Sequence, residues 1–467
     1  YKCGLSTYLA AKILGIISFL LAGIIWFFYF KGHKTKYLWL TGPLFLICPI
    51  TAFWAVSGLE LGLYAFLIAL SIIALLRNSK WLFLLLPLII LSRPEGIAIA
   101  VGMLLTVALI DWRSKSPNMK YFLCTVLIVL LTGLSLTVFR FQVFGYILPN
   151  TYYAKTYHNI LWGYKELGKM LLIFLPLSIG LIIGLFRIFF DRNKDKVFVI
   201  FGVLFLLQVF ISASIDPIMN FLFRYMIPFL PMMLVLSLSA VARISKVEYR
   251  MVMMGLFLVS LMIPLPLSLE RLNQEQIIWE AQKKFIGLAN RFPENSTISL
   301  TDMGRIPFYT SHTYYDLWGL VNEETAHDGY HPAREFLRLP DYFVMVGYLK
   351  NNQINLRFER ERAIAQNEVF PDAYELLTIC FPDGKKPSDP GYYYIVFKRK
   401  PDALNKYKGA GYTYGARSPG ICFFNIQKSN QNQRNFSSSG ISCLSSSAIS
   451  SKSYAICSSA FASFSSN

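Results

Sequence analysis

The sequence lacks the short motifs by which most nucleotide-binding and hydrolytic enzymes are recognised. No P-loop, GxSxG or HExxH string is present, and no GxGxxG string stands in a strand-turn-helix setting. Each of these motifs places a phosphate cradle, a nucleophile or a metal at a defined point of a fold. Their absence leaves nucleotide-binding and hydrolase interpretations without support.

Cysteine is sparse and unpatterned. Seven cysteines occur among 467 residues, with no CxxC pair and no spacing typical of metal ligands. The pattern indicates neither a zinc site nor a disulfide framework. We therefore predict no metal site and no cofactor, and leave open whether the protein needs a divalent cation.

Acidic residues are also few, 27 against 45 lysines and arginines, which gives a net charge of +18. The basic residues form no amphipathic basic face and lie mostly in short connections between apolar runs. This distribution argues against a nucleic-acid partner and is typical of membrane topology signals.

Apolar residues dominate the first 268 positions, and hydrophobic residues make up 54% of the chain. Runs of this length predict an α-helical polytopic membrane protein with about ten spans or half-spans. The fourth and fifth runs are short, and the 92–96 string between them holds Arg93, Pro94 and Glu95, so we expect two helices that break there. The runs cover residues 9–30, 38–56, 61–76, 81–91, 97–110, 121–143, 170–190, 197–214, 225–242 and 251–268.

The connections between successive apolar runs fall alternately on the two sides of the membrane, and basic residues are divided unequally between these two sets. One set holds fifteen of them and the other six. By the positive-inside rule the rich set is cytoplasmic. The 144–169 loop and everything after 268 are then extracytoplasmic, in an inner or plasma membrane. No signal peptide opens the chain, and its first residue is Tyr1, so we expect a fragment that lacks its natural N-terminus.

The composition divides the chain into three domains. Residues 1–268 form the predicted transmembrane domain, and residues 269–404 have the mixed pattern of a small extracytoplasmic α/β domain. Its expected strands lie near 297–301, 313–317, 342–347, 374–380 and 391–398. Residues 405–467 are low in complexity and rich in serine, which predicts a disordered tail or a translated frame error.

Four polar strings, at 57–60, 93–96, 149–155 and 216–225, end apolar runs on the predicted outward face. An ionisable side chain near hydrocarbon is costly unless it is paired or wet. We therefore predict that Glu60, Arg93, Lys155, Asp216 and Arg224 converge on one outward cavity. The plainer alternative is a set of interfacial salt bridges and an aromatic belt.

These residue types suit transfer from a lipid-linked phosphosugar. Arg93, Lys155 and Arg224 can hold a phosphate through charge-assisted hydrogen bonds, and Glu60 or Asp216 can act as the general base. Two aspartates of the C-terminal domain end strand-like runs, and the alternative for both is a turn or helix cap. The expected substrate contacts are Glu95, Asn150, Thr151, Tyr152, Tyr225, Asp302 and Asp316.

The same strings resemble a known family. The residues at 54–60, 93–96 and 149–155, Asp216 with Arg224 and Tyr225, and the outward pairs at 301–304 and 316–320 are similar in order and spacing to the GT-C polytopic glycosyltransferases. Within them they resemble the branch of the mycobacterial terminal β-(1→2)-arabinofuranosyltransferases. The resemblance covers residues 10–350. It implies a polyprenyl-phosphate sugar donor, an extracytoplasmic site and inversion at the anomeric carbon, with a cell-envelope glycan or lipid as acceptor.

One part of the family pattern is missing. The resemblance places an acidic catalytic motif in the first outward loop, which would precede Tyr1. We therefore expect the main general base upstream of this chain and the fragment to be inactive.

Two other functions compete with glycosyl transfer. One is a transporter or flippase of lipid-linked glycans, although the sequence shows no internal symmetry of the kind common in transporters. The other is a non-catalytic envelope scaffold whose outward domain binds a partner. The sugar, the acceptor, the linkage and the oligomeric state depend on pocket shape and are not encoded in residue spacing.

Overall fold

The computed structural model describes residues 6–114, 119–156, 160–190, 195–214, 220–407, 422–424 and 441–443. The chain separates into two compact units, a helical unit of residues 1–273 and a sheet unit of residues 274–467. The sequence placed the domain boundary at 268, whereas the units divide inside one helix, α14.

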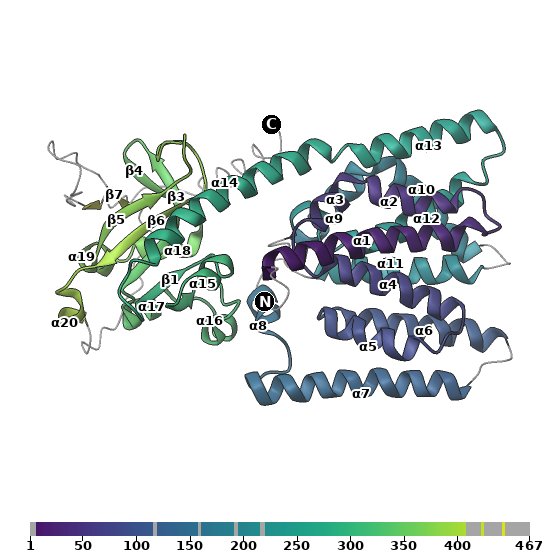
Figure 1. Ribbon diagram of the computed structural model, residues 1–467, viewed down its shortest axis with the longest axis horizontal. Helices are drawn as coiled ribbons and strands as arrows, with labels where there is room; N and C mark the ends of the chain where they lie inside the picture. The colour runs from purple at the N-terminus through teal and green to yellow at the C-terminus, as the bar shows by residue number, and fades with distance from the viewer. Residues whose placement is uncertain are drawn as a thin grey trace. The chain divides into compact units, whose positions relative to one another are not determined.

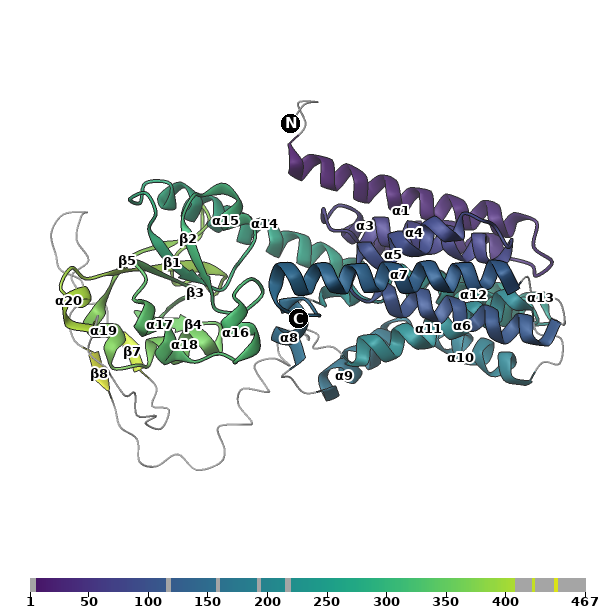
Figure 2. The same ribbon diagram turned by 90° about the horizontal axis from the view of Figure 1, so that it is seen from below.

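The helical unit is a bundle in which most helices run side by side (Figures 1 and 2). Helix α12 is buried along almost its whole length, while α7 lies at one edge and exposes most of its apolar side chains. The elements are α1 (Thr7–Lys31), η1 (Leu38–Leu40), α2 (Thr41–Ile47), α3 (Pro49–Ala55), α4 (Leu61–Leu76), α5 (Leu82–Ser92), α6 (Gly96–Ser114), α7 (Met119–Phe144), α8 (Asn150–Thr156), α9 (Ile160–Ile173), α10 (Leu175–Phe190), α11 (Lys196–Ser214), η2 (Phe221–Phe223), η3 (Ile227–Phe229), α12 (Leu230–Val241), α13 (Val247–Met262) and α14 (Leu265–Ala289).

Several helices are long and apolar enough to cross a membrane. Four stretches among the described residues meet that test directly, namely Thr7–Lys31, Lys120–Phe144, Lys196–Ser214 and Val247–Ala289. Two further pairs meet it jointly but are bent, by 61° between α2 and α3 and by 104° between α9 and α10. Pro49 and Pro176 stand at the start of the second helix of each pair, where proline removes a backbone hydrogen bond of the preceding turn.

The predicted break between the fourth and fifth apolar runs is confirmed. Helix α5 ends at Ser92, Arg93 is extended with φ −151°, and α6 begins at Gly96. A Cβ at Gly96 would lie 2.1 Å from the carbonyl oxygen of Ile89, so only glycine permits the close return of the chain. The two helices therefore form a hairpin with a polar tip.

The expected loop at 144–169 is wrong. Helix α7 ends at Phe144, five residues before Pro149, while α8 begins directly after Pro149 and α9 follows at Ile160. Proline is well tolerated at the start of a helix, where its missing N–H would have no partner, so it can begin a helix. The polar and aromatic composition of 150–156 and the charges at Lys165, Glu166 and Lys169 concealed these two helices.

The sheet unit contains a mixed sheet with the strand order β2-β1-β3-β6-β5, and β4 pairs with β3. Strands β2, β1 and β3 are parallel, and the β3-β6, β5-β6 and β3-β4 pairs are antiparallel. All five predicted strands are present. The strands are β1 (Thr297–Leu300), β2 (Thr313–Asp316), β3 (Tyr342–Lys350), β4 (Gln353–Leu356), β5 (Tyr374–Cys380) and β6 (Tyr393–Arg399).

The sequence prediction missed β4. A two-residue turn at Asn351 and Asn352 joins it to β3, and both residues have positive φ, 51° and 60°. Asparagine tolerates this conformation, and such turns match the twist of a hairpin. The Asn-Asn pair was therefore an available hairpin signal.

Helices cover both faces of the sheet. Alternate residues of β3 point to opposite faces, so Val344 packs with Phe285 of α14 while Phe343 packs with Phe370 on the other side. The other short elements are α15 (Arg305–Tyr309), α16 (Glu323–His327), α17 (Pro332–Arg338), α18 (Glu359–Ala365), α19 (Val369–Ala373), α20 (Ala403–Tyr407), β7 (Cys422–Phe424) and β8 (Ile441–Cys443). Most of the tail predicted to be disordered lies outside the described residues.

Candidate functional site

Four charged side chains of the helical unit meet in one network, which we call the charge cluster: Glu60, Arg93, Glu95 and Arg224. Arg93 Nη1 lies 2.5 Å from Glu60 Oε1, and Arg93 Nε lies 2.5 Å from Glu95 Oε1. Arg224 Nη2 reaches the same Glu60 oxygen at 3.1 Å. One carboxylate thus bridges two guanidinium groups that are distant in sequence.

Each member of the charge cluster stands at the end of a helix. Glu60 immediately precedes α4, and Arg93 and Glu95 lie in the tip between α5 and α6. Arg224 follows η2 in a short irregular segment. The ends of helices that run side by side lie together at one end of a bundle. Residues placed at those ends can therefore meet although they are far apart in sequence.

The segment before Arg224 has an uncommon backbone. Leu222 and Phe223 both have positive φ, 46° and 54°, a conformation that costs a non-glycine residue about 1 kcal/mol or more. Trp54 Nε1 donates a hydrogen bond to the Leu222 carbonyl at 3.2 Å, and Asn220 Oδ1 accepts one from the Tyr225 amide at 3.1 Å. These contacts hold the strained segment in place and so position Arg224.

Aromatic rings surround the two arginines. The guanidinium carbon of Arg93 lies 5.6 Å from the ring centre of Tyr64 and 5.7 Å from that of Tyr225. That of Arg224 lies 5.7 Å from Trp54. At these distances the ring faces attract the cations. The rings therefore fix both guanidinium groups independently of the carboxylates.

The four side chains of the charge cluster are exposed to different extents. The Arg93 side chain is 6% exposed and Glu95 12%, whereas Arg224 is 18% and Glu60 38% exposed. The two positive and two negative charges balance, which lowers the free-energy cost of burying Arg93 and Glu95. A negatively charged group that reaches the charge cluster can compete with Glu60 for both arginines.

Among the side chains that the structure describes, five of the predicted site residues come together. The five are the charge cluster and the buried Tyr225 beside it. Asn150, Thr151 and Tyr152 lie in α8, where Tyr152 is 47% exposed. The side chain of Lys155 and the whole of Asp216 lie outside the described residues, so the prediction that they join the cavity stays a prediction.

The two aspartates of the sheet unit are engaged internally. Asp302 accepts hydrogen bonds from the hydroxyls of Tyr392 at 2.7 Å and Tyr394 at 2.5 Å, and burial raises its pKa. Asp316 is buried and accepts from the amides of Trp318 at 2.8 Å and Val321 at 2.9 Å. Asp316 therefore caps its own loop, as the turn-or-cap alternative predicted, whereas Asp302 holds two tyrosine hydroxyls and is neither a turn nor a helix cap.

Sequence reasoning missed two residues near the charge cluster. Tyr64 stands four positions after Glu60, which places both on one face of α4, but it is hidden within an apolar run. Arg271 of α14 lies with its guanidinium carbon 3.9 Å from the ring centre of Phe221, next to the strained segment. The helical spacing could have revealed Tyr64, whereas no local signal reveals Arg271.

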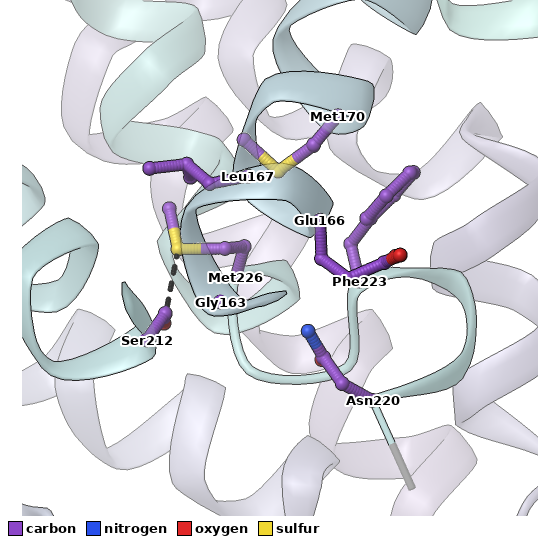
Figure 3. Close-up of a pocket in the computed structure, with 8 residues that line it drawn as sticks. All are labelled: Gly163, Glu166, Leu167, Met170, Ser212, Asn220, Phe223 and Met226. Carbon is purple, nitrogen blue, oxygen red and sulfur yellow. Dashed lines mark hydrogen bonds between the residues drawn. The ribbon is translucent and has the colours of Figure 1, made fainter. Parts of the chain in front are cut away.

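A small pocket includes Phe223 of the strained segment in its lining (Figure 3). It is lined by Glu166 and Met170 of α9 and by Asn220, Phe223 and Met226, among others. Its room for the centre of a water molecule is about 10 Å³, enough for a single water. Glu166 pairs with Lys169 at 2.7 Å. The pocket is therefore too small for a sugar.

Among the described residues, no three His, Cys, Asp or Glu side chains group as metal ligands would. The charge cluster contributes only two carboxylates, and both hold arginines. Its donor set therefore suits an anion better than a metal ion.

Residues 272–402 match a protein family described as "Domain of unknown function (DUF8728)". This range falls mostly in the sheet unit and does not include the charge cluster. No curated protein and no solved structure matches the chain.

Proposed function

We propose that the protein is a membrane glycosyltransferase that moves a sugar, with inversion, from a polyprenyl-phosphate donor to a cell-envelope glycan or lipid. The observation that supports this most is the convergence of Arg93 and Arg224 on one partly exposed carboxylate. The several helices able to cross a membrane are compatible with a lipid-linked donor.

The two arginines suit the leaving group of such a reaction. When the bond between the anomeric carbon and the phosphate oxygen breaks, the phosphate gains one negative charge. Two guanidinium groups already fixed by Tyr64, Tyr225 and Trp54 can stabilise that charge without reorganising. The donor phosphate takes the place of the Glu60 carboxylate at both arginines.

Glu60 then has a second role. While it bridges two cations it is a weak base, because protonation would forfeit both ion pairs. Once phosphate displaces it, its carboxylate can accept the proton of the acceptor hydroxyl as that oxygen attacks the anomeric carbon. Donor binding thus creates the base in the same site.

The proposal is tested by sugar transfer in membranes that contain the full-length protein with measurable activity. The donors are radiolabelled polyprenyl-phosphate sugars and the acceptors are envelope glycans. Arg93→Ala and Arg224→Ala should lower transfer about ten- to a thousandfold, the scale of ~2–4 kcal/mol for losing one charge stabiliser. Lys246→Ala, which removes a cation near the start of α13, is the matched control and should leave transfer unchanged. Equal rates in all three variants would refute the assignment.

Movement of lipid-linked glycans across the membrane is the second candidate, and the two bent helix pairs favour it. Transporters often place broken helices at their binding sites. In proteoliposomes a transporter would move the intact donor between leaflets and release no polyprenyl phosphate. Release of polyprenyl phosphate together with sugar on the acceptor would identify an enzyme. A protein that neither transfers the sugar nor moves the donor would fit a scaffold.

A further inference from the structure

Three aromatic side chains of the sheet unit lie together, which we call the aromatic patch: the half-buried Trp279 of α14 and the exposed Phe308 and Tyr309 of α15. The ring centres of Trp279 and Tyr309 are 6.0 Å apart, and those of Phe308 and Tyr309 are 5.0 Å apart. Phe308 is 60% exposed and Tyr309 44%. Two of the three rings are therefore available for contact with another molecule.

Cations accompany these rings. The guanidinium carbon of Arg305 lies 5.2 Å from the ring centre of Trp279, and Lys283 Nζ lies 5.8 Å from it. Glu275 and Glu280 stand nearby on α14, so the charge of the surface is mixed and the rings are its distinctive feature. Aromatic residues with lysine and arginine are the combination enriched at membrane interfaces.

The sequence limits how far the aromatic patch can lie from the apolar part of α14. Exposed leucines occupy its beginning, and the last of them is Leu272, which is 42% exposed. Trp279 follows seven positions later, about 10 Å along a helix and at most about 25 Å along an extended chain. The polar interface of a bilayer extends about 5–8 Å beyond each side of the hydrocarbon. Leu272 and Trp279 both belong to helix α14, so the shorter distance applies. With Leu272 at the edge of the hydrocarbon, Trp279 stands near the level of the lipid head groups.

We infer that the aromatic patch inserts into the head-group region of the same bilayer that holds the apolar helices. The occupant of this surface is lipid, and the rings lie at the boundary between head groups and acyl chains. The inference rests on the membrane setting of the proposed function and is independent of glycosyl transfer. Its consequence is that the sheet unit is restrained at the membrane surface by contacts other than its covalent link.

The test uses the full chain in proteoliposomes with a benzophenone amino acid at position 308 in place of Phe308. Ultraviolet light then links the side chain to whatever touches it. The vesicles contain phosphatidylcholine with and without phosphatidylglycerol, both radiolabelled. We expect labelled lipid on the protein in both vesicles, at least fivefold above the control variant. If the variant at 308 does not fold, position 309 serves instead.

The control carries the same group at Leu337 of α17, which is 67% exposed and belongs to the helix layer on the opposite face of the sheet. Leu134 of α7, 60% exposed, gives the positive signal for a membrane-facing helix. Lipid labelling at 308 that does not exceed labelling at 337, while 134 is labelled, overturns the inference. So does crosslinking of 308 to protein or glycan instead of lipid. Sugar transfer is not measured, so the outcome does not depend on the proposed activity.

Discussion

Glu60 is the residue on which the charge cluster depends, because among the described side chains it is the one carboxylate that contacts both Arg93 and Arg224. Arg93 keeps Glu95 as a second partner, whereas among the described contacts of Arg224 with carboxylates only that with Glu60 is present. Removing the Glu60 charge therefore leaves one guanidinium group with its ring contact alone. The four residues each carry one charge, but they differ in how many ion pairs are lost when one of them is replaced.

We expect Glu60→Gln to destabilise the full chain by about 1–3 kcal/mol, less than the ~3–5 kcal/mol for a fully buried pair because Glu60 is partly exposed. Thermal unfolding in detergent measures the change. Adding Arg224→Gln should restore part of the loss, since it removes the cation left unpaired. An additive double variant would show that the two residues are not coupled.

Glu361 of the sheet unit is a second decisive residue. It is fully buried, its Oε1 accepts a hydrogen bond from the Thr301 hydroxyl at 2.8 Å, and burial raises its pKa from 4.5 to about 8. The folded state therefore holds a proton that the unfolded state releases. The stability contributed by this group is complete below pH 4.5 and is lost as pH rises through 8.

This gives a prediction for pH dependence. Hydrogen exchange of the β1 and β3 amides in the full chain should become faster relative to its intrinsic rate between pH 5 and pH 8. Glu361→Gln imitates the protonated carboxyl and should flatten that dependence. Asp302, whose pKa burial also raises, remains in the variant and leaves a smaller slope. An unchanged slope in Glu361→Gln would contradict the assignment.

At the scale of elements, the α5–α6 hairpin carries Arg93 and Glu95 to the charge cluster. Its geometry depends on Gly96, because any side chain there would collide with the Ile89 carbonyl. Gly168 of α9 offers a contrast, since a Cβ at that position meets nothing within 4 Å. Both glycines lie in helices of the helical unit, but a side chain has room at Gly168 and has none at Gly96.

Alanine at these two positions should have opposite effects. Gly96→Ala should cost about 2 kcal/mol or more, through the backbone shift that relieves the collision, and should weaken any anion binding at Arg93. Gly168→Ala should stabilise the protein by about 0.5–1 kcal/mol, the helix propensity difference. Thermal unfolding of both variants provides the comparison. Equal effects would mean that the close return at Gly96 is not required.

At the scale of the whole molecule, the sheet unit has its own hydrophobic cores on both faces of its sheet. A unit that buries its apolar side chains against itself does not need another unit to fold. We therefore expect residues 274–407 to fold alone and to unfold in one cooperative transition, measured by circular dichroism. A gradual transition without a baseline would show that the cores are incomplete without the helical unit.

The sequence alone determined the local structure of most of the chain. Apolar runs predicted the long helices, alternating patterns predicted five strands, and Arg93-Pro94-Glu95 predicted a break, because periodicity and proline act within a few residues. It failed at 144–169, where polar, aromatic and charged residues concealed two helices. Only the tertiary structure decided which charged residues meet. Glu60 and Arg224 are 164 positions apart, and their contact depends on how the helix ends pack, as does the internal use of Asp302 and Asp316. Local patterns carry no information about such distant partners, since these are fixed by burial and by the pairing of charges that burial requires.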